Sequence, residues 1–313
     1  MSNNILSQVP SISKIKREIK KSLFGEYLFC PKCGSKQIKP VENRYRCLVC
    51  RKRFSLTSVT WLKSMKISLE TFWLLLWCWI NEVSIKQTVK LTGVSKPTIR
   101  KWFQKFRDNL PNSDNITLSG IIQMDEAYRG GKKRGYSIIG AKEEKQNGRK
   151  SKLALKVINK PSVDRRDAIS FLSQYVEPDS RLQTDASSIY RGITHWWRVS
   201  HEYERHNKWE FALTSEIEGV WGNLTKFIRK MYDHVTRDFI EDIVREFAIR
   251  KSHPVWFETT YSYVRISFQK IERPRQKEWR GQYQKKRLKI NTSKSRNYPI
   301  NSLPTKLSTV PSC

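Results

Sequence analysis

The sequence has no long apolar segment and no recognisable export signal. Its longest apolar run is the nine residues from Phe72 to Ile80, whereas a helix that crosses a membrane needs roughly 20. The first ten residues lack the charged start and apolar core of a secretory signal. We therefore expect a soluble, intracellular protein without a membrane partner, in which the apolar run is a buried helical segment.

Acidic residues are also scarce, with 29 Asp and Glu against 60 Lys and Arg and a formal net charge of +31. Such a charge requires a polyanionic partner or an unusually hydrated surface. Nucleic acid is the leading candidate, because each phosphate neutralised by a basic side chain releases a condensed counterion. A membrane surface is a weaker alternative, because the basic residues are spread over the whole chain rather than along one amphipathic helix.

The composition divides the 313 residues into five parts. Residues 1–25 are polar and basic and predict a loose leader. Residues 26–58 hold four of the six cysteines, and residues 59–110 have helical spacing. After a short polar linker, residues 116–253 alternate between strand and helix patterns. Residues 254–313 carry 13 basic and three acidic residues without a clear period. We expect this segment to be partly ordered or disordered and able to contact DNA.

The alternating part predicts a mixed α/β domain, in which helices flank a central sheet. The expected strands lie at 120–124, 136–141, 153–158, 181–184 and 196–200, and the expected helices lie at 164–176, 215–231 and 238–249.

Two C-x-x-C pairs stand 13 residues apart in the N-terminal region, and their members are Cys30, Cys33, Cys47 and Cys50. In an intracellular chain this spacing favours metal binding over disulfides. Four thiolates make a tetrahedral site for one structural zinc ion and leave no open position for catalysis. Free structural cysteines and a redox pair are the alternatives.

The residues around these cysteines are those of a small zinc ribbon. Gly34 suits the positive φ that such turns often need, and Lys36 to Arg46 can form a β-hairpin. So small a unit buries too little apolar surface to fold alone, so we expect the metal to hold it together. Cys78 lies in the apolar helix and is expected in the core, while no role is expected for the terminal Cys313.

Residues 85–107 have the pattern of a helix, a tight turn and a second helix, which is typical of a helix-turn-helix. Ser84 and Ser95 can cap the two helices, and Gly93 permits the turn. One face of the second helix is an apolar stripe made of Ile99, Trp102, Phe103 and Phe106. Early residues of such a second helix reach base edges, which predicts DNA contacts by Lys96, Thr98, Arg100, Lys101 and Gln104. An ordinary helical hairpin with a solvated basic face is the alternative.

Three acidic residues stand where a sheet could bring them together. Asp125 and Asp185 each end a predicted strand, and Glu218 lies near the start of the helix at 215–231. Carboxylate oxygens suit Mg²⁺ or Mn²⁺. Two such ions about 4 Å apart can activate an attacking oxygen and stabilise a leaving one in phosphoryl transfer. Capping and helix-dipole roles are the alternatives for each residue alone.

Two neighbouring acids are expected to point elsewhere. Side chains alternate across a strand, so Glu126 cannot share a face with Asp125. On a helix Glu216 is about 200° from Glu218, so only one of the two can face the metals.

At these positions the chain resembles one group of DDE insertion-sequence transposases, whose eukaryotic relatives are called Merlin elements. The segments that carry the resemblance are 124–132, 176–190, 217–221 and 243–250, within roughly 26–253. The resemblance implies an RNase H-like catalytic fold after an N-terminal zinc ribbon and a helical DNA-binding region. It also carries the catalytic triad onto Asp125, Asp185 and Glu218.

The resemblance further implies cleavage and strand transfer at short terminal inverted repeats in double-stranded DNA, with two Mg²⁺ or Mn²⁺ ions. Such enzymes usually act as homo-oligomers, because two ends must be joined together. We expect the protein at the nucleoid of a prokaryotic cell or in a eukaryotic nucleus.

Two positions depart from the group's pattern. Relatives often have His-Thr-Asn before the Ile-Glu, where this chain has Leu213-Thr214-Ser215. Some members use that Asn as the third ligand, and Ser215 would replace it poorly, which favours Glu218. The group's Lys seven residues after the Glu is Thr225 here, and Lys226 lies about 80° around the helix. Two alternatives therefore stay open, a catalytically decayed DNA-binding regulator and an RNase H-like nuclease that cuts without joining.

Overall fold

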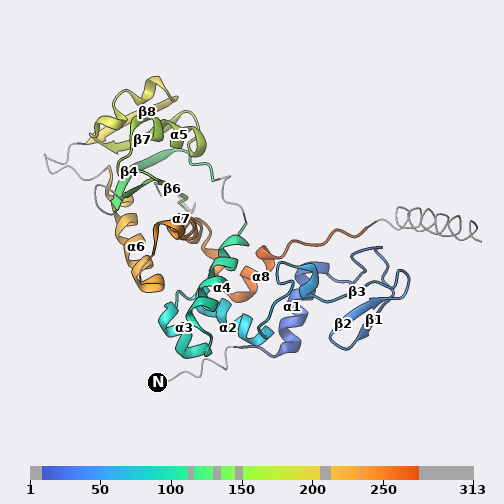
Figure 1. Cartoon of the computed structure of the whole chain (residues 1–313). Coiled ribbons are helices and arrows are strands. Elements are labelled where there is room, and N and C mark those ends of the chain that lie inside the picture. The colour runs from blue at the N-terminus through green and yellow to red at the C-terminus, as the bar shows by residue number, and fades with distance from the viewer. Residues whose placement is uncertain are drawn as a thin grey trace, which may run out of the picture.

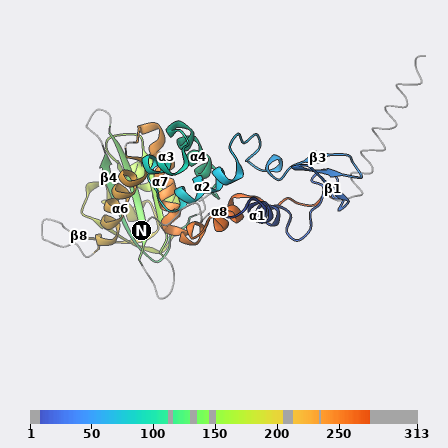
Figure 2. The same ribbon diagram turned by 90° about the horizontal axis from the view of Figure 1, so that it is seen from below.

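The computed structural model shows three regions in a row, a three-stranded ribbon, a group of helices and a five-stranded mixed sheet (Figure 1). Seen from below, the ribbon stands away from the other two regions (Figure 2). The residues that the structure describes are 9–111, 116–129, 135–144, 151–204, 213–233 and 235–274.

The ribbon is an antiparallel sheet of β1 (Ile38–Val41), β2 (Arg44–Cys47) and β3 (Arg53–Phe54). The hairpin expected between residues 36 and 46 is confirmed, and β3 adds a third strand on β2.

The middle region consists of α1 (Ile12–Phe24), α2 (Leu69–Ile80), α3 (Ile85–Thr92), α4 (Lys96–Asp108) and α8 (Thr260–Ser267). Ser68 caps α2 by accepting a hydrogen bond from the Thr71 N–H, and Ser84 caps α3 in the same way. The apolar run lies in α2, with all its side chains except that of Trp77 buried. No helix among the described residues is both long enough and apolar enough to cross a membrane.

The expectation of a loose leader over residues 1–25 is wrong for its second half. Residues 12–24 form α1, and Ile15, Ile19 and Leu23 are buried in the core. These residues recur every fourth position in an otherwise basic segment, which is one apolar stripe of a helix. Averaging the composition of the segment hides this stripe.

The C-terminal segment, for which we expect partial order or disorder, is folded as far as residue 274. Tyr263, Val264 and Phe268 in and after α8 are buried. The chain then runs back along the N-terminal regions, where the Ile271 N–H donates to the Leu23 carbonyl oxygen over 2.9 Å. Residues 275–313, including Cys313, lie outside the described residues.

The five-stranded sheet has the order β6-β5-β4-β7-β8. Its strands are β4 (Ile121–Arg129), β5 (Tyr136–Glu143), β6 (Leu153–Ile158), β7 (Ser180–Asp185) and β8 (Val199–Glu204). β4, β5 and β6 are antiparallel neighbours, whereas β7 runs parallel to β4 and β8 runs parallel to β7. This is the RNase H-like arrangement of a mixed α/β domain, as expected.

Helices cover both faces of this sheet. They are α5 (Arg165–Tyr175), α6 (Ser215–Tyr232) and α7 (Arg237–Ser252). Two short 3-10 helices, η3 (Ser188–Tyr190) and η4 (Ile193–His195), lie between β7 and β8 in the chain. Two others lie elsewhere in the chain, η2 (Thr57–Val59) before α2 and η6 (Pro254–Phe257) before α8. Alternate residues of β5 enter different cores: Ile139 packs with α5, and Ile138 packs with α6 and α7. The second of these cores continues without a break through α1, α2, α4 and α8.

Two strands, β4 and β8, differ most from their expected bounds. β4 continues four residues beyond Asp125, to Arg129, because it pairs with β5 over that whole length. Asp125 therefore lies within the strand rather than at its end. β8 begins at Val199, three residues after the expected start at Trp196, whose side chain is exposed.

Candidate active site and metal centre

Asp125 and Asp185 stand on adjacent parallel strands. In the ladder between β4 and β7, Gln123 pairs with Gln183. The same offset two residues further along sets Asp125 beside Asp185. Because side chains alternate across a strand, a step of two residues keeps the carboxylates on the face occupied by the two glutamines.

A tryptophan on α6 holds the first of these carboxylates. The Trp221 indole N–H donates to Asp125 Oδ2 over 2.8 Å. Its ring lies against Gly140 of β5, where a Cβ would come within 2.7 Å of ring carbon Cη2. Gly140 is the cross-strand partner of Asp125. The missing side chain at this position is therefore what lets the indole reach the carboxylate.

Gln123 joins the start of α6 directly to the sheet. Its side-chain oxygen accepts the backbone N–H groups of Glu216 and Ile217 over 2.9 and 3.1 Å. Thr214 occupies the N-cap position of α6 but makes no side-chain cap. The cap thus comes from β4, two residues before Asp125 and on the same face of the strand. It places the first turns of α6, which carry Glu218, over this part of the sheet.

A second carboxylate, Glu204 at the end of β8, anchors the segment before α6. Glu204 is buried and accepts hydrogen bonds from the Leu213 N–H and the Thr214 hydroxyl, over 2.9 and 2.8 Å. The Thr214 hydroxyl oxygen also lies 3.3 Å from Glu218 Oε1. Thr214 thus connects Glu204, at the end of β8, with Glu218.

The electrostatics of Asp125 reflect this crowding. Burial raises the pKa of Asp125, and the charges of Asp185 and Glu218 raise it further, while the Trp221 N–H opposes the shift. The charges of Asp185 and Glu218 therefore act on Asp125. Among the described residues, the group of side chains placed to hold one metal ion is the four N-terminal cysteines, whose ligand atoms all lie within 4.8 Å of one another.

The two neighbouring acids point away from this group, as expected. Glu126 lies on the other face of β4 and accepts hydrogen bonds from the hydroxyls of Tyr190 and Tyr128. Burial raises the pKa of Glu126. Glu216 forms a salt bridge of 2.6 Å with Lys142 of β5.

Sequence reasoning missed Gln123, Gly140, Glu204 and Trp221. Only Trp221 carried a signal, because it stands three residues after Glu218 and so on a neighbouring part of the same helical surface. The capping alternative for Asp185 is also met, since its Oδ1 accepts the Ser187 N–H over 3.0 Å just before η3.

The four ribbon cysteines converge as predicted. The sulfurs of Cys30 and Cys50 are 3.5 Å apart and those of Cys33 and Cys47 are 3.6 Å apart. Both distances exceed the ~2.05 Å of a disulfide. They approach the roughly 3.8 Å expected between sulfurs that are each about 2.3 Å from one tetrahedral zinc. Backbone N–H groups also lie against two of the sulfurs, which favours thiolates.

Gly34 is required in this turn for two reasons. Its φ is +67°, and a Cβ here would come within 2.2 Å of the Pro274 carbonyl oxygen. The Arg273 guanidinium also donates to the Gly34 carbonyl oxygen over 2.7 Å. The segment after α8 therefore packs directly on the first cysteine turn.

The helix pair α3 and α4 is joined by a turn in which Gly93 has a φ of 67°. The apolar stripe of α4 is fully buried. Ser95 stands at the N-cap of α4, but its hydroxyl pairs with the Thr98 hydroxyl rather than with the backbone. Lys96, Arg100 and Lys101 are exposed.

Gln104 differs from the other predicted DNA contacts. Its amide nitrogen donates to Asp242 of α7 over 2.7 Å, and its oxygen accepts from Arg107 over 2.6 Å. Gln104 is therefore partly covered by α7, which packs against this part of α4, and its predicted DNA contact stays a prediction.

Comparisons with known proteins find a family match for this part of the chain. Residues 117–252, which include Asp125, Asp185 and Glu218, match the family model of the ISXO2-like transposase domain. The resemblance to DDE insertion-sequence transposases is confirmed. No curated protein matches the chain.

Two kinds of solved structure are similar to this chain. One is a simian T-cell lymphotropic virus intasome in complex with PP2A regulatory subunit B56 gamma, at 12% identity, with 57% of this chain and 68% of that chain covered and a TM-score of 0.34. The other is the HTLV-2 integrase catalytic core domain in complex with magnesium. Its dimeric form is 14% identical, with 43% of this chain and 86% of that chain covered and a TM-score of 0.26.

Proposed function

We propose that this protein is a DDE transposase that binds the terminal inverted repeats of its element and catalyses metal-dependent strand cleavage and strand transfer. One observation carries the proposal. Within the segment that matches the transposase family model, Asp125 and Asp185 each follow by two residues the paired Gln123 and Gln183 on adjacent parallel strands, and Gln123 also caps the helix that carries Glu218.

Asp125, Asp185 and Glu218 would hold the catalytic metals, Mg²⁺ or Mn²⁺. The fit rests on the donor set. Burial and the charges of Asp185 and Glu218 raise the pKa of Asp125, and a bound cation would stabilise its charged form. When bound, two such ions activate an attacking oxygen and stabilise a leaving one. Trp221 fixes one oxygen of Asp125 and leaves the other for a ligand.

The proposed reaction has two steps at one site. A water oxygen attacks the phosphodiester at an element end, and the bond from phosphorus to the 3′ oxygen breaks, with a proton passing to that oxygen. The freed 3′-hydroxyl then attacks a phosphodiester of the target DNA. The target's own 3′ oxygen leaves and takes up the proton that the attacking hydroxyl loses.

The N-terminal regions would hold the DNA. In this proposal the four cysteines bind one structural Zn²⁺, and α3 and α4 form a helix-turn-helix whose exposed Lys96, Arg100 and Lys101 contact double-stranded DNA. Two ends must be joined together, so the active form on DNA would be a homo-oligomer. Its place in the cell would be with the DNA, in the nucleoid or the nucleus.

A decayed DNA-binding regulator is the second candidate function. The observation in its favour is Thr225, which stands where relatives carry a Lys. Its hydroxyl donates to the Trp221 carbonyl oxygen over 2.8 Å, so this position supplies no cation to the site. Lys226 is exposed on a neighbouring part of the helix.

Labelled element ends, target DNA and Mg²⁺ test these functions together. A transposase gives joined products, a nuclease gives cleaved ends only, and a regulator gives a bound complex without cleavage. The absence of joined products with intact ends and either ion would contradict the proposed function.

A further inference from the structure

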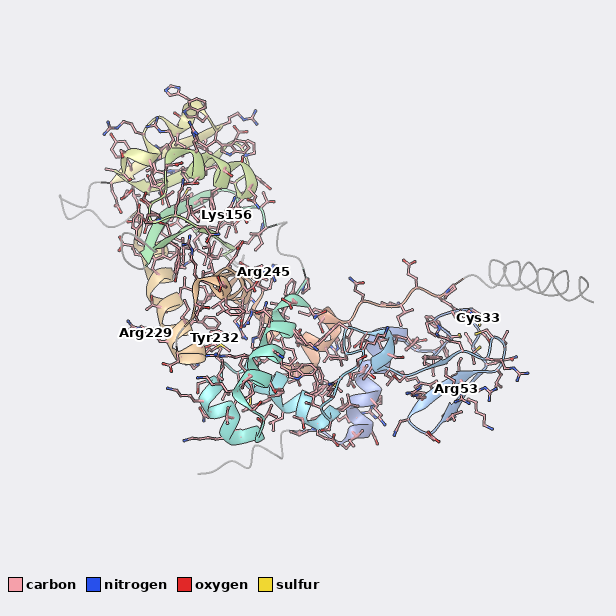
Figure 3. The ribbon with its side chains drawn as sticks, viewed as in Figure 1. Cys33, Arg53, Lys156, Arg229, Tyr232 and Arg245 are labelled. Carbon is pink, nitrogen blue, oxygen red and sulfur yellow. The ribbon has the colours of Figure 1, made fainter. Side chains whose placement is uncertain are left out.

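A groove between α4 and the start of α7 has no role in the fold or in the proposed reaction. Its volume is about 370 Å³. Its walls are mostly apolar and include Phe103, Tyr232, Phe239 and Ile243, while Arg100 and Lys101 stand at its rim. Figure 3 labels Tyr232, at the end of α6 that lies toward α4. The groove is thus continuous with the α4 surface proposed to contact DNA.

The floor of the groove is held by buried polar contacts. Arg107 of α4 donates to the Tyr232 hydroxyl over 2.9 Å and forms a salt bridge with Glu246 of α7. The contact of Gln104 with Asp242 joins the same two helices nearer the rim. Because these side chains fix α4 against α7, the groove is already formed before a ligand enters.

Phe239 gives the groove an accessible aromatic face. It lies in the first turn of α7 and is 52% exposed, whereas Phe103 and Ile243 are buried. Proteins bind unstacked nucleotides with aromatic rings beside cationic side chains, because every nucleotide offers the π-face of its base and an anionic phosphate. The ring thus offers a stacking surface next to Arg100 and Lys101.

The occupant is constrained by size and by charge. The volume is near the lower end of the roughly 300–1,000 Å³ of pockets that take small molecules. A second copy of this chain would bring a net charge of +31 to a basic rim, which is unfavourable. A nucleotide supplies both an apolar base for the walls and an anionic phosphate for the rim.

We propose that this groove takes one unstacked base of the DNA bound along α4. The inference rests on the proposed DNA binding and adds a nucleotide site to it. Unstacking is least costly where a base is already unpaired. The protein should therefore prefer duplexes that contain an unpaired nucleotide.

The test uses the full chain and two short fluorescein-labelled duplexes that differ only by one unpaired nucleotide, at matched salt. Wild type should bind the duplex with the unpaired nucleotide about tenfold more tightly. Phe239→Ala should lose this preference and keep wild-type affinity for the paired duplex, while Phe239→Tyr should retain the preference. Tyr203→Ala is the matched control, because Tyr203 is 56% exposed but lies on β8 outside the groove.

A 2-aminopurine at the unpaired position gives a second readout. On binding to wild type, its fluorescence should be protected from acrylamide quenching, and Phe239→Ala should abolish the protection. Normal paired-duplex binding without any preference, or a preference that survives Phe239→Ala, would overturn the base site and leave DNA binding intact. A changed sedimentation coefficient of free Phe239→Ala would overturn it in favour of an interface between copies. Failure to bind either duplex would contradict the proposed function itself.

Discussion

At the scale of single residues, the site depends on which side chains the sheet and α6 bring together. Asp125 and Asp185 share a row of the sheet, and Glu218 comes from the helix above it. Glu216, two residues earlier, is turned toward Lys142. The acids of this region are thus divided into Asp125 with the two carboxylates whose charges act on it, and single acids with other partners.

This division predicts the effect of removing each carboxylate. Asp125→Ala, Asp185→Ala and Glu218→Ala should each lose most cleavage and joining activity, because catalysis here is mainly positioning and charge stabilisation. Glu216→Ala should retain activity and lose only its half-exposed salt bridge. The measurement is strand cleavage and joining, with DNA affinity as the control for folding. Full activity in Asp125→Ala or Asp185→Ala would end the DDE assignment.

The hydrogen bond from Trp221 should act through Asp125. Trp221→Phe keeps a ring over Gly140 and removes a hydrogen bond to a charged group, which is worth about 1.5–3 kcal/mol. We expect cleavage to fall about tenfold or more and the Mg²⁺ concentration for half-maximal activity to rise. Gly140→Ala should have the same effects, because its methyl group would displace the indole. Unchanged metal dependence in both variants would show that the indole only fills space.

At the scale of elements, the ribbon and α4 have different stabilities. The ribbon has three short strands, and its cysteines form a small core of their own. α4 instead buries an aromatic stripe in the largest core of the protein. Metal removal should therefore affect the ribbon first and leave α4 in place.

Zinc should be bound at one ion per chain and should hold the ribbon together. Cys47→Ser removes one of four ligands, so we expect zinc content to fall and the ribbon to become sensitive to proteases. Metal analysis of the purified protein measures the first effect. Cys78→Ser is the control, because Cys78 is buried in α2 away from the cluster. A folded protein without zinc would refute this prediction.

DNA contacts by α4 should depend on its exposed basic residues. Arg100→Ala and Lys101→Ala should weaken binding to element ends. Loss of a base contact should reduce the preference for end DNA over random DNA by about 1–3 kcal/mol, whereas loss of a phosphate contact should weaken binding to all sequences equally. The comparison is between end DNA and random DNA at matched salt. Wild-type affinity for end DNA in both variants would mean that α4 is not the reader.

At the scale of the whole molecule, a buried polar network joins the helical region to the domain of the five-stranded sheet. Glu246 of α7 is fully buried and bonds to Arg107 of α4, to Tyr232 of α6 and to Arg250. Arg250 in turn donates to the Trp79 and Ile80 carbonyl oxygens at the end of α2. The helices proposed to bind DNA are therefore fixed relative to the site rather than tethered to it.

Removing the central charge should destabilise both regions together. Glu246→Gln leaves two buried guanidinium groups without a counter-charge, so we expect a loss of about 3–5 kcal/mol. Glu241→Gln, an exposed position on the same helix, should change stability little. Thermal unfolding followed by helical and aromatic signals should show one shared transition at a lower temperature. Separate transitions for the two regions would contradict a shared core.

Features that depend on neighbours in the chain were predictable. The cysteine spacing, the serine caps of α2 and α3, the apolar stripe of α4 and the alternation of Asp125 and Glu126 all follow from local geometry. The strand positions were predictable for the same reason, except at β4, which pairing extended, and at β8, which begins three residues later than expected. The helix over residues 12–24 could have been predicted from its apolar residues, which recur every four positions, but not from its average composition.

Only the tertiary structure decided which distant residues meet. Trp221 reaches Asp125 across 96 positions of sequence, and that contact exists because Gly140 on a third segment has no side chain. The cap from Gln123 on α6 and the docking of α7 against Gln104 are of the same kind. Such contacts arise from the packing of elements on the sheet, which no local pattern encodes. The amino-acid pattern therefore identified the acids, and the packing of α6 on the sheet determined how they are held.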